Sequence, residues 1–260
     1  MFKHPIIEDI NKIPQFKQKS QEWLNQRKGF LTSSDAASAL GINPYSTKDE
    51  LIFKKCGLCK PFTGNIATRH GEKYEDEAIE HYCNVMGMVN YEFGLIPYSQ
   101  VTRENHDHRL DFLAGSPDGI SLPINGSESS KPVLIEVKCP FRRKPIQGYC
   151  PGYYYPQVQL NMLICNLEIS DFIEYIPSTK KLYITRIFKD HDWLEKSLPV
   201  LINFWDEVTA YRSKGIDTHP NYEKTKVRIE KFMKRESDKQ LLLEAASKVE
   251  SAYQMESDSD

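Results

Sequence analysis

The sequence lacks an apolar run long enough to cross a membrane, and its start lacks the pattern of a secretion signal. The first residues, "MFKHPIIEDINKIPQF", do not show the basic-then-apolar order that such signals have. No internal repeat is visible. We therefore expect an intracellular protein, in the cytoplasm or, for a viral protein, in the host cytoplasm or nucleus. Its 260 residues are enough for one large domain or one domain with an appendage.

A strong charge of either sign is also missing. The formal net charge is −2, which neither demands nor forbids nucleic acid as a partner. Any DNA contact must therefore come from a local basic patch, because the field of the whole protein will not supply it. The content of 40% hydrophobic and 11% aromatic residues allows a packed core.

The cysteines do not form a metal-binding pattern. Cys56 and Cys59 form a CxxC, but the sequence has neither a second CxxC nor a His pair beside it. A structural zinc site is therefore poorly supported, and we interpret the six cysteines as free thiols.

Hydrophobic periodicity and capping signals place helices first and strands later. "HGEKYEDEAIEHYCNVMG" is the clearest helix, ended by Gly87, and residues 20–26 are a shorter amphipathic one with Trp23 and Leu24 on its apolar side. Further helices are expected after residues 32–34 up to Gly41, after a capping box at residues 47–50, at residues 156–165 and at residues 191–211. Strands are expected at residues 91–97, 110–114 and 133–138, with a hairpin at residues 171–188.

This order predicts a single α/β (α+β) domain with a mixed sheet flanked by helices. We expect the domain to span residues 1–220 with a helical N-terminal part. Residues 221–260 are then a charged, partly helical extension that ends in the acidic, disordered tail "MESDSD".

A turn and a strand carry the residues of chemical interest. Asp118 lies in "GSPDG", and Glu136 and Lys138 share one face of a strand while Val137 points into the core. Charges at the end of a buried strand need a reason, and a divalent cation such as Mg²⁺ provides one. Asp118 would be its second carboxylate. Lys138 would hold or deprotonate the attacking water, or stabilise charge on a phosphate.

The neighbouring residues show a resemblance to a family. "SPDG", "IEVKCPF" and "YYYPQVQLNM" follow one another in the order found in the phage lambda exonuclease family, the YqaJ-type viral recombinases of the PD-(D/E)xK nuclease superfamily. "EWLNQRKGFLTSSDAASALG" and "HGEKYEDEAIEHY" resemble the N-terminal motifs of that family. The resemblance runs from about Gln21 to Phe188 and implies the restriction-endonuclease-like core of the superfamily, with a central mixed sheet.

The resemblance also implies a metal site. Asp118, Glu136, the Val137 carbonyl and Glu75 would bind Mg²⁺, for which Mn²⁺ can substitute, and Lys138 would serve the attacking water. Without the resemblance, Glu75 would be taken for a solvated helix carboxylate, since other acids surround it.

Two further groups follow from the resemblance. Gln157, which directly follows Pro156, matches an active-site glutamine that orients water or phosphate, and Gln159 is a neighbouring alternative. Arg27, Ser34 and Ser116 match residues that hold a 5′-terminal phosphate; an arginine fork and a helix N-terminus both suit phosphate. Each is also an ordinary residue for its place, and Ser33 could replace Ser34.

Other residues near these motifs have open interpretations. Arg142, Arg143 and Lys144 follow the catalytic strand and either contact the DNA backbone or form a solvated loop. The tyrosines of residues 148–155 either stack an unpaired base or pack in the core and loops.

The segment "HDHRLD" also contains potential ligands. Asp107 or Asp111 could supply an outer-sphere carboxylate, but we do not expect His106 and His108 to bind metal, because neither matches a ligand of the family.

The function that the resemblance implies is a 5′-to-3′ exonuclease acting on double-stranded DNA ends. It would release 5′-mononucleotides and leave single strands for an annealing or recombination protein. Two alternatives stay open: an endonuclease or structure-directed nuclease with the same metal site, and a non-catalytic module that binds DNA ends. The phage family forms a trimeric ring. The longer loop "SLPINGSESSKPV" and the unmatched segment after Asp217 leave the oligomeric state of this chain open.

Overall fold

Two mixed sheets form the centre of the fold. The computed structural model describes residues 4–59, 64–235 and 237. The larger sheet has the strand order β2-β5-β6-β7-β8, and its strands are β2 (Met88–Tyr91), β5 (Gly119–Pro123), β6 (Val133–Lys138), β7 (Ile169–Ile176) and β8 (Lys181–Phe188). The smaller sheet has the order β1-β4-β3, with β1 (Leu31–Thr32), β4 (Leu113–Gly115) and β3 (Ile96–Pro97).

Strand β6 is the central strand of the larger sheet. It pairs with β7 in parallel and with β5 in antiparallel orientation, and all of its residues except Lys138 are buried. Strands β2 and β8 pair antiparallel at the two edges. The prediction that the Glu-x-Lys strand is central is confirmed.

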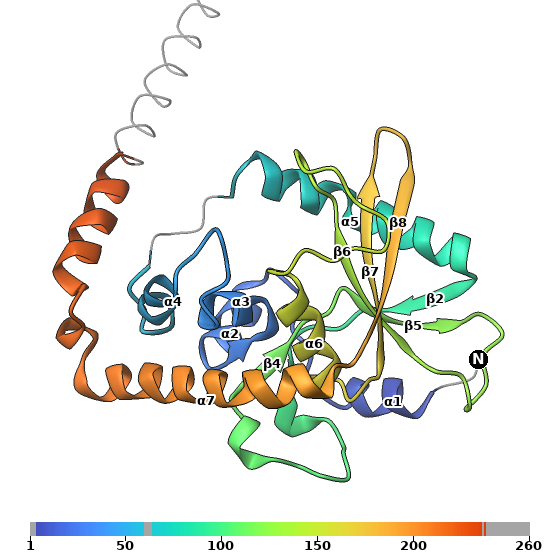
Figure 1. Ribbon diagram of the computed structural model, residues 1–260, viewed down its shortest axis with the longest axis horizontal. Helices are drawn as coiled ribbons and strands as arrows, with labels where there is room; N and C mark the ends of the chain where they lie inside the picture. Colours follow the sequence, from blue (N-terminus) through green and yellow to red (C-terminus); the bar gives the residue numbers. More distant parts are fainter. Residues whose placement is uncertain (1–3, 60–63, 236, 238–260) are drawn as a thin grey trace, which may run out of the picture.

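Helices lie against both faces of the larger sheet, α5 (Ile66–Met86) on one and α6 (Tyr155–Ile164) on the other (Figure 1). The other helices up to residue 214 are α1 (Pro5–Asn11), α2 (Gln21–Lys28), α3 (Ala36–Ala39), α4 (Lys48–Lys55) and α7 (His191–Lys214). Ala78 and Tyr82 of α5 pack with Ile135 and Val137, which point to one face of β6. Helix α6 packs in the main core with Leu134 on the opposite face. Alternate residues of β6 therefore face different helices.

Local sequence signals explain the ends of the helices. Thr47 and Glu50 form the predicted capping box of α4. Asn65 caps α5 by accepting a hydrogen bond from the Thr68 amide, so the helix starts one turn before the expected His70. Gly87 ends it with φ +63°, a conformation that suits glycine.

The helix at residues 156–165 and the hairpin at residues 171–188 are confirmed. The prediction of one strand at residues 91–97 is wrong. Strand β2 ends at Tyr91, and of the residues after it only Ile96 and Pro97 lie in a strand, β3. Helix α1 and strand β5 had no prediction. Helix α2 exists, but its predicted apolar side is wrong, because α2 has no buried residue and Leu24 is 45% exposed.

The C-terminal part of the described chain is helical again. Residues 222–235 form a helix, and Arg228 contacts Glu50 of α4 at 2.9 Å. The tail at residues 255–260 lies outside the described residues, and the division at residue 220 remains a prediction. In the described part of the chain, no helix has both the length and the apolar content needed to span a membrane.

Candidate active site

The acid of the turn meets the acid of the strand. Gly119 pairs with Ile135 in the antiparallel register, so Asp118, one residue earlier, lies opposite Glu136. The Asp118 carboxylate accepts a hydrogen bond from the Val137 amide at 2.6 Å. The turn is therefore tied directly to the end of β6.

Both glycines of "GSPDG" allow this close approach. A Cβ on Gly115 would lie 2.4 Å from the Asn161 side-chain oxygen, and one on Gly119 would lie 2.0 Å from the Asn90 side chain. Neither position can hold a larger residue without displacing a neighbour. The motif thus places Asp118 against β6 by removing side chains on each side of it.

Glu136 is held by donors from two elements. Lys138 Nζ and Gln157 Nε2 both donate to Glu136 Oε1 at 2.5 Å, and Asn161 Nδ2 donates to Oε2 at 3.2 Å. Gln159 points elsewhere and donates to a backbone carbonyl of β8. The structure therefore brings Gln157, and not Gln159, to the strand acids.

Asn161 was missed by the sequence analysis. It lies one helical turn after Gln157 on α6, is fully buried, and its Oδ1 has no hydrogen-bond partner in the described chain. The i, i+4 spacing is the signal that could have found it, because two residues so spaced share a helix face.

Burial and neighbouring acids raise the pKa of two acids of the site, Glu136 and Glu75. Burial, together with the charges of Asp118 and Glu75, raises the pKa of Glu136 to about 7, although Lys138 opposes the shift. Burial and the charge of Asp118 likewise raise the pKa of Glu75. Such mutual repulsion is relieved by a cation. The donors are all oxygens, so the site fits Mg²⁺ or Mn²⁺ better than a thiol- or imidazole-seeking metal.

Lys138 remains an ammonium group in this environment. Burial would lower its pKa, but the charges of Glu136 and Asp118 outweigh that effect and raise it above its ordinary value. Its Nζ also donates to the Val137 carbonyl at 3.0 Å. The site therefore offers a fixed positive charge beside the acids.

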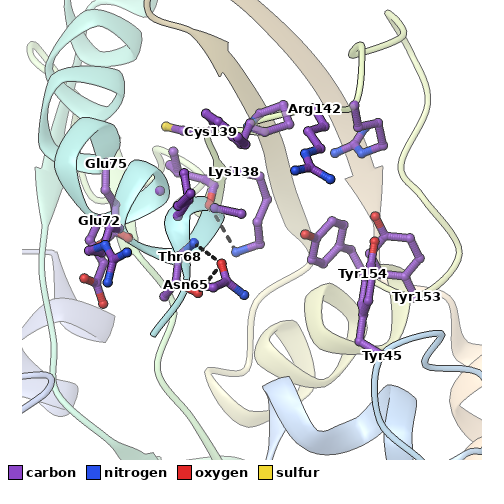
Figure 2. A pocket seen from close by; sticks show the side chains of 18 of the residues that line it. Tyr45, Asn65, Thr68, Glu72, Glu75, Lys138, Cys139, Arg142, Tyr153 and Tyr154 are labelled. Carbon is purple, nitrogen blue, oxygen red and sulfur yellow. Dashed lines mark hydrogen bonds between the residues drawn. The ribbon is translucent and has the colours of Figure 1, made fainter. Parts of the chain in front are cut away.

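A cavity of about 910 Å³ opens over the end of β6 (Figure 2). Glu75, Val137 and Lys138 line it. In Figure 2, Lys138 lies between Glu75 on one side and tyrosines on the other. The tyrosines that line the cavity are Tyr45, Tyr153 and Tyr154.

The three basic residues after β6 have different surroundings. Arg142 and Arg143 line the cavity, whereas Lys144 is exposed and does not. Arg143 pairs with Glu174, which is 1% exposed and lies on β7 opposite Lys138. Of these three residues, Arg142 and Arg143 are placed to meet a phosphate in this cavity.

The three residues of the predicted phosphate site are joined through Trp23. Arg27 donates to Ser34 Oγ at 2.8 Å and lies 4.3 Å above the Trp23 ring. The Trp23 indole in turn donates to Ser116 Oγ at 3.2 Å. Ser33 is 2% exposed, so Ser34 is the accessible serine. The structure thus brings together residues from α2, the segment after β1 and the "GSPDG" turn.

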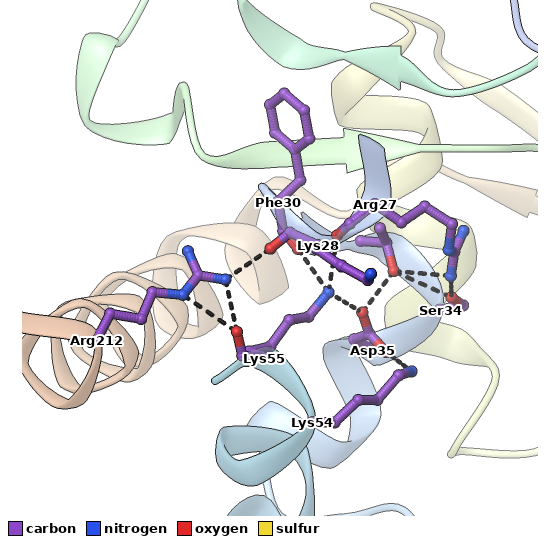
Figure 3. Close-up of polar contacts among 9 residues, drawn as sticks. Arg27, Lys28, Phe30, Ser34, Asp35, Lys54, Lys55 and Arg212 are labelled. Carbon is purple, nitrogen blue, oxygen red and sulfur yellow. Dashed lines mark hydrogen bonds and ion pairs between the residues drawn. The ribbon is translucent and has the colours of Figure 1, made fainter. Parts of the chain in front are cut away.

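A buried ion cluster, which the sequence analysis missed, lies beneath Arg27 (Figure 3). Asp35 pairs with Lys55 at 2.7 Å and with Lys54 at 3.1 Å. Lys55 also donates to the backbone carbonyls of Arg27 and Phe30. Burial would raise the pKa of Asp35, but the surrounding cations lower it well below its ordinary range.

The His-containing segment forms a separate cluster. His106 and His108 both contact the Asp111 carboxylate, at 2.6 and 3.2 Å, and the potential ligand atoms of these three residues lie within 4.8 Å of one another. Asp107 instead pairs with Arg109. That His106 and His108 do not bind a metal stays a prediction.

The sheet, the acid turn and the Glu-x-Lys strand together define a PD-(D/E)xK nuclease-like fold. Within that class, the chain belongs to the family of the YqaJ-like viral recombinase domain, whose model matches residues 22–168. This confirms the family that the motifs indicated, and the match covers the acids of the site and Gln157.

Viral proteins are among the relatives. The chain is 36% identical to "Uncharacterized protein R354" of Acanthamoeba polyphaga mimivirus over 177 residues, which cover 65% of this chain and 31% of that protein. It is 28% identical to "Protein D345L" of African swine fever virus (strain Badajoz 1971 Vero-adapted) over 160 residues, which cover 57% of this chain and 46% of that protein. The match thus spans less than half the length of these curated relatives.

Solved structures share the fold. The alkaline exonuclease LHK-Exo from Laribacter hongkongensis superposes with a TM-score of 0.56 at 23% identity, covering 85% of this chain and 100% of that one. LHK-Exo in complex with dAMP gives a TM-score of 0.57 at 22% identity, covering 75% and 95%. The fold class predicted from the sequence is therefore confirmed.

Proposed function

We propose that the chain is a divalent-cation-dependent 5′-to-3′ exonuclease that acts on double-stranded DNA ends. It releases 5′-mononucleotides and leaves a single strand for an annealing or recombination protein. The observation that carries the proposal is the linked group of Asp118, Glu136, Lys138 and Gln157 at the end of β6, where Lys138 and the neighbouring Glu75 line the cavity. Because most of them are buried, charged or hydrogen-bonded to one another, an accidental surface cluster does not explain them.

Each residue has a role that its contacts support. Asp118, Glu136, Glu75 and the Val137 carbonyl would hold Mg²⁺ or Mn²⁺, which supplies Lewis-acid stabilisation of the charge on the phosphoryl oxygens. Lys138, held as an ammonium group, donates to the attacking water and to the developing charge and does not act as the base.

Gln157 completes the proposed chemistry from the helix side. Its amide already donates to Glu136 Oε1, so its remaining polar atoms are available to orient water or a phosphate oxygen in line with the bond that breaks.

The polarity rests on the phosphate site of Arg27, Ser34 and Ser116. The Arg27 side chain is oriented by Ser34 and by stacking on Trp23, which suits it to bind a terminal phosphate with its forked donors. Capture of a 5′-phosphate there would leave the first phosphodiester bond to the acids at β6.

The proposed partners and location follow from this activity. Relatives in two viruses support a role in a virus-infected cell, in the cytoplasm or nucleus of the host. A homo-oligomer, such as a trimeric ring, remains a proposal that a solution mass measurement would test.

Digestion of a linear duplex with Mg²⁺ tests the activity. One strand carries a 5′ label, the other a 3′ label, and a closed circle and a Lys138→Ala variant serve as controls. Early release of the 5′-labelled mononucleotide, with an intact circle and an inactive variant, is the expected result. A nicked or cut circle would favour an endonuclease. No cleavage by the wild type would refute catalysis by this chain.

The phosphate site has its own test. Arg27→Ala should digest 5′-phosphorylated duplexes more slowly, at a rate close to that of 5′-hydroxyl duplexes, while the wild type prefers the phosphate. Equal preference in both proteins would exclude the pocket. Arg109→Ala is the matched control, because Arg109 is an exposed arginine that pairs with Asp107, away from the cavity.

A further inference from the structure

One wall of the cavity is a row of tyrosines that leads from the surface to Lys138. Tyr45 and Tyr153 meet edge to face with ring centroids 5.7 Å apart, and Tyr153 and Tyr154 lie 4.4 Å apart. Lys138 Nζ lies 5.4 Å from the centroid of the Tyr154 ring. Figure 2 shows the three rings together on the side of Lys138 away from Glu75.

The exposure of Tyr45 is not explained by packing. It is 79% exposed, on the connection before α4, so the fold gains little from its ring. Tyr155, the third of the consecutive tyrosines, shows what a structural tyrosine looks like here: its hydroxyl donates to Asp190 at 2.9 Å and its ring packs on Trp193. The interpretation of residues 148–155 as packing is thus right for Tyr155, whereas Tyr153 faces the cavity.

Cations lie beside this tyrosine wall. Arg142 lines the cavity and has no acidic partner among the described residues. Arg143 is held by buried Glu174, whose second carboxylate oxygen has no partner in the described chain. Aromatic rings beside such cations form the combination that binds single-stranded nucleic acid, where rings stack on bases and cations contact phosphates.

We infer that Tyr45 and Tyr153 form a stacking site for an unpaired base of the strand being cleaved, with Arg142 on its phosphate. The inference rests on the proposed function, because it places the base next to the site at β6. Stacking offsets the lost pairing and stacking of the terminal base pair, so the chain draws one strand away from the duplex end. It follows that a short 5′ single-stranded extension binds more tightly than a blunt end.

Binding of a 2-aminopurine probe tests this site. The probe is a duplex with a 5′-phosphorylated single-stranded extension that carries 2-aminopurine, and a blunt duplex of the same length is its reference. Both are titrated with the full chain in a Lys138→Ala background with Mg²⁺. Stacking on a tyrosine should quench the fluorescence of the probe.

The matched variants separate stacking from general damage. Tyr45→Ala and Tyr153→Ala should each weaken binding of the extension about tenfold and remove the quenching. Tyr153→Phe keeps the ring and should behave as the parent does. Tyr149→Ala removes a 50% exposed tyrosine that does not line the cavity, and it should also bind the extension and quench the probe as the parent does. Because Tyr45 is so exposed, Tyr45→Ala should fold normally, which circular dichroism checks.

Two results would overturn the inference. One is equal affinity and quenching in Tyr45→Ala, Tyr153→Ala and Tyr149→Ala. The other is an equal loss of affinity for the blunt duplex and for the extension. Hydrolysis by the wild type is measured separately: quenching that depends on the tyrosines without hydrolysis would refute the nuclease, and hydrolysis without such quenching would refute the stacking site.

Discussion

In the described part of the chain, two buried acids pair with a lysine, and the two pairs differ in how many partners the lysine has. Lys55 pairs with Asp35 and also donates to two backbone carbonyls, so its three protons all have partners. Lys138 donates to Glu136 and to the Val137 carbonyl, and its side chain is 23% exposed at the cavity. The Lys55 side chain is only 4% exposed.

The acids differ in the opposite sense. Several cations surround Asp35 and lower its pKa, whereas other acids lie near Glu136 and raise its pKa to about 7. The pair of Asp35 and Lys55 is therefore electrostatically complete. The pair of Glu136 and Lys138 is incomplete, because the acids around it leave an excess of negative charge. A buried ion pair therefore indicates a reactive site only when some of its charge is left uncompensated toward a cavity.

The variant with the largest expected effect is the one that breaks the incomplete pair. Lys138→Met should reduce DNA hydrolysis by about 10²- to 10⁴-fold, because it removes the charge and proton donor beside the reacting phosphate. Its stability should change little, since Glu136 can take up a proton when the lysine is lost. Single-turnover cleavage and urea unfolding measure both quantities. A variant that retains activity would exclude Lys138 from the chemistry.

Breaking the complete pair should instead reduce the stability of the protein. Lys55→Met leaves Asp35 buried without its main partner and should lower the free energy of unfolding by about 3–5 kcal/mol. Lys54→Met is the control: Lys54 also contacts Asp35, but its side chain is 55% exposed, so about 1 kcal/mol or less is expected. Equal losses in urea unfolding of the two variants would contradict the comparison.

The sequence predicted the incomplete pair and not the complete one, for a physical reason. Glu136 and Lys138 are two residues apart on a strand, so strand periodicity places them on one face. Asp35 and Lys55 come from different elements, and only the packing of α4 against the segment after β1 brings them together. Contacts of that kind have no local pattern in the sequence.

The presence or absence of a local sequence pattern also explains which elements of the fold were predicted. Helix α6 and the β7–β8 hairpin are marked by periodicity and turn residues, and both were found. Helix α2 has a helical pattern but no buried apolar face. Its Trp23 contacts Arg27 and Ser116 instead of packing in the core. Strand β5 begins at Gly119, the last residue of "GSPDG", and the glycines and proline of this motif are turn signals that hide the start of a strand.

Asn161 sharpens the account of the incomplete pair from the helix side. Asn161→Ala removes the donor to Glu136 Oε2 and should reduce activity about 10- to 100-fold at low Mg²⁺, as expected for a residue that positions a metal ligand. Higher Mg²⁺ should restore part of the rate. Gln159→Ala is the control, since Gln159 is equally buried but contacts β8, and its Mg²⁺ dependence should match the wild type.

The smallest effect is a pair of opposite pH slopes in stability, measured by urea unfolding with a chelator present. The pKa of Asp35 is lowered in the folded state, so its contribution is present above its ordinary pKa of 3.8 and is lost as the pH falls below that value. The pKa of Glu136 is raised from 4.5 to about 7, so the folded state binds more protons in that range and stability falls as the pH rises through it.

The two slopes can be removed independently. Each group contributes at most about 1.4 kcal/mol per pH unit inside its own window. Asp35→Asn should flatten the loss of stability below pH 3.8, and Glu136→Gln should flatten the decline between pH 4.5 and about 7. If Glu136→Gln kept that decline, the excess of negative charge would lie on another group. The distinction between a complete and an incomplete pair would then be wrong, because it depends on the raised pKa of Glu136, and the activity of the Lys138 variants could not restore it.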